Sequence, residues 1–183
     1  MAAPTLCSSR VSGGHVVLVY PGVVRVRPMT PDDAPAVADV WYRAWRDGHL
    51  GHVPDELVAL RTPESFGPRA AARVPGTCVA DVDGQVAGFA TVVGDELEEL
   101  FVDAGHRGSG VAAALLADAE HRLAAAGVET AWLAVVAGNA RARRFYAKQG
   151  WRDDGPFDYA AEGPDGTRIP VPCRRYVKEL RQA

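Results

Sequence analysis

The sequence has few cysteines, no excess of basic charge and no long apolar run. Its 183 residues contain three cysteines, Cys7, Cys78 and Cys173, which are far apart and outside any Cys-x-x-Cys spacing. An odd number of dispersed cysteines argues against a disulfide framework and a zinc site, and it is typical of proteins of the reducing cytosol. We therefore expect a cytoplasmic protein without a bound metal.

The charge balance and the hydropathy exclude two further classes of partner. A formal net charge of -3 leaves no basic excess to neutralise a nucleic-acid backbone. The most apolar N-terminal run, Val16 to Tyr20, is far shorter than the ~20 residues that a membrane-spanning helix needs. We expect neither nucleic acid nor a membrane as partner.

What is present is the composition of an ordinary globular domain, with 48% hydrophobic and 23% charged residues. Residues 1–22 are small and polar and are interrupted by Gly and Ser, which indicates a flexible N-terminal extension. Residues 23–183 then predict one domain, because a chain of this length buries enough apolar surface to need no disulfide or metal staple.

Local patterns in the first half predict a strand, a helix and a hairpin. Val23–Arg27 alternates apolar and basic residues as a half-exposed strand does. Thr30–Asp33 supplies a capping hydroxyl, a proline at the first helical position and two carboxylates, so a helix is expected from there to about Gly48. Residues 55–72 predict one irregular helix or two short ones. Asp83-Gly84 predicts the tight turn of a β-hairpin.

The second half alternates strands with helices. Apolar runs and glycine stops predict strands at 97–102, 131–136, 151–159 and 173–180, and helices at 108–126 and from Asn139 to Gln149. The whole chain is then a sheet of six or seven strands with about four helices, which begins antiparallel and ends with strand-helix-strand units.

The loop between the strand at 97–102 and the following helix has the features of an anion site. Gly108 and Gly110 permit close backbone approach, and the start of the helix presents unpaired N–H groups. This geometry binds a phosphate or pyrophosphate. The spacing fits neither the Walker loop nor the dinucleotide fingerprint, although another phosphate-loop nucleotide binder stays as an alternative.

Two blocks of the second half resemble the GCN5-related N-acetyltransferases. The pyrophosphate loop of that family, Arg/Gln-x-x-Gly-x-Gly/Ala, is matched by Arg107 to Ala112. Its second block, an Asn with a Tyr seven positions later and then a Gly-aromatic pair, is matched by Asn139, Tyr146 and Gly150-Trp151. Both blocks occur in the right order and spacing, and the resemblance extends over about residues 23–180.

This resemblance implies an α+β fold, an α/β three-layer sandwich. Its mixed, mainly antiparallel sheet of six to seven strands is flanked by about four helices and splays between the fourth and fifth strands, here 97–102 and 131–136. The resemblance also implies acetyl-CoA as cosubstrate in that splay, with Asn139 touching the cofactor arm. The backbone of Leu100, Phe101 and Val102 would pair with the pantetheine, and the pyrophosphate would be held by the amides of Arg107, Gly108, Ser109, Gly110, Val111 and Ala112.

The implied reaction is direct transfer of the acetyl group to a primary amine, of a small molecule or a peptide, in a ternary complex. The amine has to lose a proton, and the departing thiolate has to gain one. Tyr146 is our choice for the acid, because a phenol with a pKa of about 10 is protonated at neutral pH. The alternative is a core aromatic residue beside Phe145.

The sequence offers three carboxylates as the general base. Members of the family often use a glutamate of the fourth strand, and we choose Glu98, with Glu96 and Glu99 behind it. Strand alternation puts Glu99 on the opposite side from the other two unless a bulge intervenes. A carboxylate that only binds substrate, with water chains carrying the proton, is the alternative. The strand-five glutamate of some relatives is replaced here by Ala134.

Other choices stay open at this level. A non-catalytic sensor or scaffold that binds acyl-CoA is the alternative function, and a homodimer is in keeping with look-alike proteins. Basic residues after Asn139 either meet the 3′-phosphate of CoA or are solvated; these are Arg141, Arg143 and Arg144. Aromatic residues of the first helices either line the acceptor pocket or form core; these are Trp41, Trp45 and Phe66.

Overall fold

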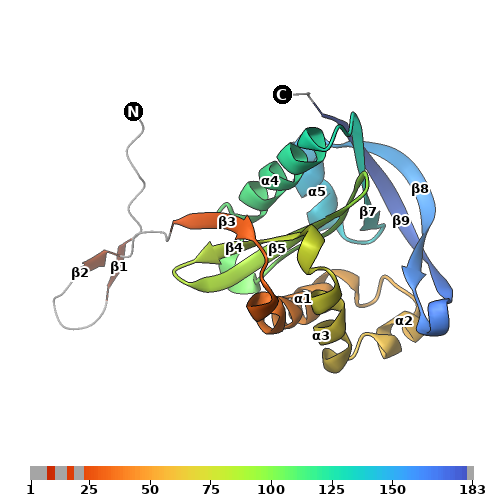
Figure 1. Cartoon of the computed structure of the whole chain (residues 1–183), viewed down its shortest axis with the longest axis horizontal. Coiled ribbons are helices and arrows are strands. Elements are labelled where there is room, and N and C mark those ends of the chain that lie inside the picture. Colours follow the sequence, from red (N-terminus) through yellow and green to blue (C-terminus); the bar gives the residue numbers. More distant parts are fainter. Residues whose placement is uncertain (1–7, 11–15, 19–22, 181–183) are drawn as a thin grey trace.

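The fold is built on one seven-stranded mixed sheet (Figure 1). The structure is a computed structural model, and it describes residues 8–10, 16–18 and 23–180. Neighbouring strands are antiparallel except β6 and β7, which are parallel. In sheet order the strands are β3 (Val24–Pro28), β4 (Thr77–Val82), β5 (Gln85–Val93), β6 (Glu96–Val102), β7 (Thr130–Val136), β9 (Arg168–Glu179) and β8 (Arg152–Glu162).

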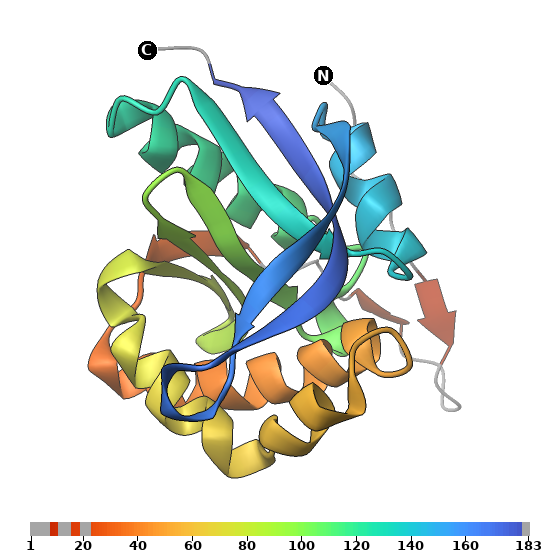
Figure 2. The same cartoon turned by 90° about the vertical axis from the view of Figure 1, so that its right-hand side faces the viewer.

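Helices cover both faces of this sheet (Figures 1 and 2). One face carries α1 (Ala34–His49), α2 (Asp55–Leu60) and α3 (Pro63–Ala72), and the other carries α4 (Val111–Ala125) and α5 (Ala140–Lys148). The result is a three-layer sandwich, which confirms the predicted fold class. The stretch 55–72, expected to be irregular, is two short helices.

Short 3-10 turns connect several elements: η1 (Pro31–Asp33), η2 (Val74–Gly76), η3 (Ala104–His106) and η4 (Pro164–Gly166). Before the sheet, β1 (Ser8–Arg10) and β2 (Val16–Leu18) pair with each other in antiparallel orientation. The flexible extension predicted for residues 1–22 otherwise lies outside the described residues.

Each helical layer buries its own apolar core against the sheet. On the α1 and α3 side, Trp41 meets Phe66 and Phe89 edge-on, with ring centroids 5.4 and 5.5 Å apart. On the α4 and α5 side, Leu115 and Leu116 are fully buried. Apolar burial on this scale is the main free energy that holds the layers together.

The turns follow from local chemistry. Asp83 and Gly84 have φ values of +53° and +82°, as a primed hairpin turn requires, which confirms the predicted hairpin. At the start of the first helical segment, the Thr30 N–H and hydroxyl both donate to the Asp33 carboxylate at 2.8 Å. The same carboxylate accepts two hydrogen bonds from Arg27, at 2.7 and 2.8 Å, so it joins β3 to the helix start.

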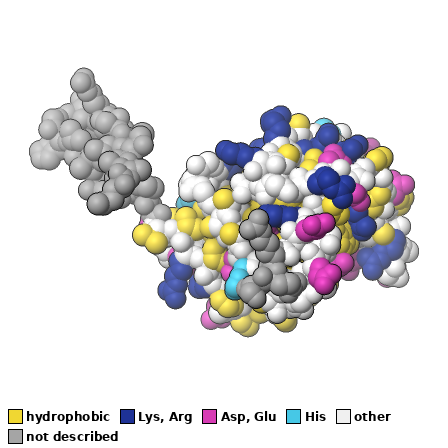
Figure 3. Space-filling view, turned by 90° about the horizontal axis from the view of Figure 1, so that it is seen from above, with side chains coloured by type: hydrophobic (Ala, Val, Ile, Leu, Met, Phe, Trp, Pro, Cys, Tyr) yellow, Lys and Arg dark blue, Asp and Glu magenta, His cyan; other side chains and the backbone are white. Residues whose placement is uncertain are grey.

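The outer surface carries charges of both signs. On the face seen in Figure 3, Lys and Arg side chains are interspersed with Asp, Glu and small hydrophobic areas. This face therefore shows no broad field of one sign, in keeping with the formal net charge of -3.

Candidate functional site

The sheet opens between its two parallel strands. Glu96 of β6 pairs with Trp132 of β7, and the Trp132 N–H donates to the carbonyl of Asp95 at 3.1 Å. This is the one register pair between the two strands, so the rest of the β6 edge, up to Val102, diverges from β7. The predicted splay between the strands at 97–102 and 131–136 is thereby confirmed.

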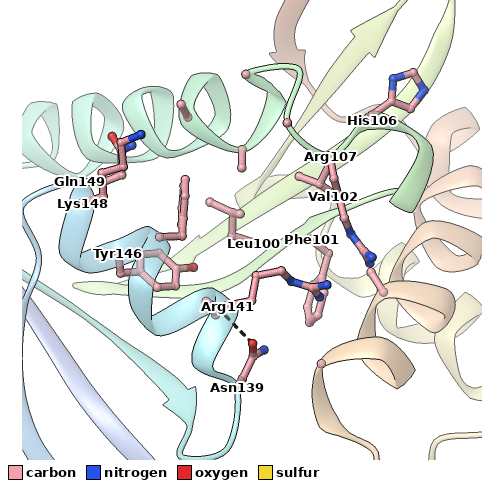
Figure 4. Close-up of a pocket in the computed structure, with 18 of the residues that line it drawn as sticks. Leu100, Phe101, Val102, His106, Arg107, Asn139, Arg141, Tyr146, Lys148 and Gln149 are labelled. Carbon is pink, nitrogen blue, oxygen red and sulfur yellow. Dashed lines mark hydrogen bonds between the residues drawn. The ribbon is translucent and has the colours of Figure 1, made fainter.

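A first cavity of about 430 Å³ lies at this opening (Figure 4). It is bounded by the end of β6, the loop after it, the start of α4, and α5. The sequence-predicted residues that line it are Leu100, Phe101, Val102, Arg107, Gly108, Gly110, Ala112, Asn139 and Tyr146. Ser109 and Val111 belong to the same loop but do not line the cavity, since Val111 is buried in the core and the Ser109 hydroxyl donates to the His106 carbonyl at 2.6 Å.

The loop before α4 presents free backbone donors to this cavity. Gly108 and Gly110 have φ values of +78° and +92°, a conformation that side chains disfavour. At both positions no atom lies within 4 Å of where a Cβ would stand, so the space beside the backbone is open. Among the described residues, no acceptor bonds the N–H groups of residues 108–113. This arrangement suits a bound phosphate chemically.

Basic side chains surround the same cavity. Arg141 and Lys148 of α5 line it, and Figure 4 shows Arg141 reaching from α5 towards Phe101. Arg107 lines it as well while pairing with Asp47 at 2.5 Å. Arg143 is directed elsewhere, with its guanidinium 3.6 Å from the carboxylate of Asp153. Of the three arginines considered from the sequence, Arg141 is therefore placed to meet an anion here.

Tyr146 belongs both to the core and to the cavity. Its ring contacts Phe145, Trp151 and Tyr176, and the residue is 8% exposed. In Figure 4 its hydroxyl points from α5 into the cavity, towards the side where Leu100 lies. Burial raises the pKa of Tyr146 above its usual value, so the phenol keeps its proton at neutral pH.

Asn139 holds the start of α5. Its Oδ1 accepts a hydrogen bond from the Ala142 N–H at 3.1 Å, as an N-cap residue does. Its Nδ2 lies 2.9 Å from the place where a Cβ on Gly48 would stand, so a side chain at residue 48 would displace the Asn139 amide. The cap fixes the side chain at the wall of the first cavity.

A second cavity of about 370 Å³ lies on the α1–α3 side, and His49 and Phe101 line both cavities. Trp41 and Trp45 line it and also belong to the core, whereas Phe66 is core alone. Its charged lining residues come from far apart in the chain; they are Arg61, Arg69, Arg73, Glu98, Glu99, Glu162 and Arg168.

Two glutamates of this cavity, Glu98 and Glu99, bind the same arginine, Arg73. The β5–β6 register shifts between Thr91 and Val92, which pair with Glu99 and Leu97, so Glu98 is the extra residue of a β-bulge. Glu98 accepts two hydrogen bonds from Arg73 at 3.1 Å, and the Oε1 of Glu99 lies 2.7 Å from the Arg73 Nε. The bulge therefore brings two consecutive carboxylates to the same cavity.

The environments of the three candidate glutamates differ. Glu99 is 7% exposed, and its Oε2 is buried without a hydrogen-bond partner. Burial, and then the neighbouring Glu98, raise the pKa of Glu99 well above its usual range, against the opposing effect of Arg73. Glu96 lies outside the second cavity, and burial raises its pKa to about 7 while a hydrogen bond from Tyr159 opposes the shift.

His49 is a residue whose position the sequence did not reveal. Its ring stacks on Trp45 at 4.9 Å, and its Nδ1 donates to the Trp45 carbonyl at 2.9 Å. Burial lowers the pKa of His49 to about 4, so the ring is neutral at pH 7. His52, three residues further along the chain, packs on Gly138 instead. No local pattern signals that His49 lies where two cavities meet.

The comparisons identify the family. Residues 37–151 match the acetyltransferase (GNAT) family, and the chain belongs to it. Uncharacterized N-acetyltransferases of Mycobacterium tuberculosis (strain ATCC 25618 / H37Rv) and Mycobacterium bovis (strain ATCC BAA-935 / AF2122/97) are each 40% identical over 78 residues, which are 40% of this chain and 50% of the relative. The chain thus spans about half the length of the curated relatives it matches. The resemblance noted from the two sequence blocks is confirmed.

Solved structures show the same fold. A GCN5-related N-acetyltransferase from Rhodopseudomonas palustris superposes with a TM-score of 0.68 at 22% identity, over 91% of this chain and 100% of the other. The PaiA N-acetyltransferase of Thermoplasma acidophilum, in complex with coenzyme A, gives 0.63 at 16% identity, over 86% and 99%. YncA of Salmonella typhimurium, a putative acetyltransferase with its cofactor acetyl-CoA, gives 0.64 at 16%, over 88% and 96%.

Two further observations concern the described part of the chain only. None of its helices is long and apolar enough to cross a bilayer. No group of His, Cys, Asp and Glu side chains within residues 8–10, 16–18 and 23–180 is arranged to hold a metal ion.

Proposed function

We propose that this protein binds acetyl-CoA in the first cavity and transfers its acetyl group to a primary amine bound in the second. The observation that carries this proposal is that the two cavities meet at His49 and Phe101, while one of them ends at a loop of free backbone N–H groups. A thioester held in one cavity is then next to an amine held in the other.

The first cavity fits the cosubstrate by its donors. The free amides from Gly108 to Ala112, with Arg107, hold the pyrophosphate, and Arg141 or Lys148 meets a further phosphate. The diverging β6 edge at residues 100–102 pairs with the amide groups of the pantetheine, and Asn139 contacts the same arm. The complexes of PaiA with coenzyme A and of YncA with acetyl-CoA support this assignment.

Bound acetyl-CoA supplies an activated acyl group, and the chain supplies the proton transfers. The amine nitrogen attacks the acetyl carbon, so an N–C bond forms and the C–S bond breaks. A glutamate of β6 accepts the proton that the amine loses, and the Tyr146 hydroxyl gives a proton to the departing sulfur. The products are an acetamide and free CoA, and proton exchange with solvent resets both groups.

Glu99 suits the role of base better than Glu98, our choice from the sequence. A buried carboxyl with an unpartnered oxygen and a raised pKa takes a proton at neutral pH more readily than one that shares a guanidinium through both oxygens. Both line the second cavity, so Glu98 stays as the alternative base.

The state of the two buried cysteines favours direct attack of the amine on the thioester over transfer through an acetylated cysteine. Cys173 lines the second cavity and Cys78 is buried in β4, and burial raises the pKa of both to about 11. Thiols of this kind stay protonated at pH 7 and are poor nucleophiles, so an acetyl-cysteine relay is not part of the proposal.

Calorimetry and a turnover assay test the proposed function. Acetyl-CoA titrated into the purified full chain should give a saturable heat, and CoA should be released faster with an amine panel than by hydrolysis alone. Absence of binding heat would overturn the proposal. If acetyl-CoA binds tightly but no amine increases CoA release, the protein is instead a non-catalytic sensor or scaffold that binds acyl-CoA.

A further inference from the structure

One buried guanidinium of the second cavity lacks the carboxylate partner that Arg69 and Arg73 have. Arg73 is paired with Glu98 and Glu99, and Arg69 with Glu162 at 2.6 Å. Arg61, which follows α2, has no carboxylate within salt-bridge distance among the described residues. Arg168 also lines the cavity without such a partner, but it is exposed, so Arg61 is the buried cation of this cavity that has no paired carboxylate.

Arg61 is also buried with an unmet donor. Arg61 directly follows α2 and reaches the end of β8, where its Nη2 donates to the Glu162 carbonyl at 2.9 Å. The residue is 8% exposed, and its Nη1 is buried without any acceptor. Burial, together with the charges of Arg69 and Arg73, lowers the pKa of Arg61 to about 10, so it is still a cation at pH 7.

Burying a cation that keeps a free hydrogen-bond donor costs folding free energy unless an anion binds to it. A guanidinium is a planar fork of N–H donors that matches the oxygens of a carboxylate or a phosphate. The carboxyls of Glu98 and Glu99 line the same cavity and attract an ammonium group, and apolar side chains such as Val53 and Leu57 complete the wall. The cavity thus offers a negative site, an apolar wall and a positive site to one small molecule.

We propose that Arg61 binds an oxyanion of the acceptor, so that the acceptor is a small amine that also carries a carboxylate or a phosphate. This inference rests on the proposed function and adds the substrate class to it. It disfavours polyamines and aminoglycosides, because their additional positive charges would face Arg61 without an anion to offset it.

Matched pairs of amines test the inference on the unmodified protein. Each pair shares a carbon skeleton and differs in the anion: leucine with 3-methylbutylamine, phenylalanine with phenethylamine, and phosphoethanolamine with ethanolamine. CoA release should give a kcat/KM that is about tenfold to a hundredfold higher for the anionic member of at least one pair. The carboxylate and phosphate pairs distinguish the two kinds of oxyanion.

Variants assign that preference to Arg61. Arg61→Gln should raise the KM of the anionic acceptor and bring the two members of the pair close to parity, with the KM for acetyl-CoA unchanged. Arg61→Lys, which keeps the charge, should restore part of the preference. Arg46→Gln is the matched control, since Arg46 is an exposed arginine of α1 outside both cavities, and it should keep the full preference.

The outcomes separate this inference from the proposed function. Efficient acetylation of neutral amines or polycations in preference to their anionic counterparts would overturn the role of Arg61 and leave the acetyltransferase standing. Acetyl-CoA binding without turnover of any anionic amine would overturn the inference as well. Failure to bind acetyl-CoA would overturn the proposed function itself. The paired comparison needs no variant, so it decides the matter even where Arg61→Gln fails to fold.

Discussion

Glu98 and Glu99 are consecutive in the chain, yet both carboxylates contact the guanidinium of Arg73. Regular strand geometry would direct them to opposite faces of the sheet. The bulge at Glu98 removes that alternation, so the two acids share one cavity. Burial, and then the nearby charge of Glu98, raise the pKa of Glu99.

The pH dependence of turnover distinguishes the two glutamates. A general base acts when it is deprotonated, so the rate rises with pH through its pKa, and a raised pKa brings that rise close to neutral pH. Glu99→Gln should remove this rise and lower kcat by about a hundredfold or more. Initial rates from pH 5 to 9 at saturating acetyl-CoA give the measurement.

Glu98→Gln is the paired variant for that experiment. It leaves Glu99 with Arg73, so the rise of rate with pH should persist. If Glu98→Gln flattens the profile while Glu99→Gln keeps it, the base is Glu98, as the sequence suggested. Profiles unchanged in both variants would leave a water chain as the carrier of the proton.

Removal of the Tyr146 hydroxyl should lower kcat without weakening the binding of acetyl-CoA. Tyr146→Phe keeps the ring contacts with Phe145, Trp151 and Tyr176, so the fold and the affinity for acetyl-CoA should be unchanged. The loss of a proton donor to the leaving sulfur should lower kcat by about a hundredfold. Tyr42→Phe, on α1 and outside both cavities, is the control. An unaltered kcat in Tyr146→Phe would show that another group protonates the thiolate.

A carboxylate in the loop before α4 should abolish binding of the cosubstrate. Gly110→Glu places a negative group in the open space beside the free amides, where a pyrophosphate would repel it at a cost of several kcal/mol. That cost corresponds to an affinity loss of more than about a hundredfold. Calorimetric titration with acetyl-CoA measures it.

Gly110→Glu also introduces backbone strain, because it puts a side chain at a positive φ, so a control is needed that has the strain without the position in the loop. Gly84→Glu supplies it, because Gly84 has φ +82° and open space around it in the β4–β5 turn, away from both cavities. It should bind acetyl-CoA as the parent protein does. Equal affinities in Gly110→Glu and Gly84→Glu would remove the loop from the binding site.

Asp33 should contribute stability that depends on pH. Hydrogen bonds from Arg27 and Thr30 hold the pKa of Asp33 far below its usual range. Its contribution is therefore complete above the unfolded-state pKa of about 4 and is lost as the pH falls from there towards the folded-state value. Asp33→Asn should lower the free energy of unfolding at pH 7 by about 2 kcal/mol, as measured by urea denaturation.

Asp32, the exposed neighbour of Asp33, provides the control variant for this measurement. Asp32→Asn lies in the same turn and lacks those hydrogen bonds, so its unfolding free energy should change little. At pH 3 and below, the difference between Asp33→Asn and the parent should shrink. A constant difference at all pH values would mean that the carboxylate charge of Asp33 is not what stabilises the turn.

Local patterns in the sequence predicted most of the elements. The Asp83-Gly84 turn, the capping of the first helical segment at Thr30, and the helix that begins after Asn139 depend on a few neighbouring residues, and each was found. The two blocks around Gly110 and Tyr146 also predicted the lining of the first cavity, because a strand-to-helix loop creates its free amides locally.

The second cavity was beyond that kind of prediction. Arg61, Arg73, Glu99 and Glu162 come from four separate segments of the chain and meet only through folding. The bulge at Glu98 follows from how β5 and β6 pair, and no pattern in Glu96–Val102 announces it. The neutral state of His49 likewise results from burial between α1 and the sheet.

The sequence by itself determined the order of strands and helices along the chain, the glycine loop before α4 and the family, because these depend on short-range propensities and spacings. Tertiary structure decided which carboxylate is desolvated, which buried arginine is left without a paired carboxylate, and where the two cavities join. Desolvation and charge pairing depend on every group packed within a few ångströms, and distant parts of the chain supply most of those groups.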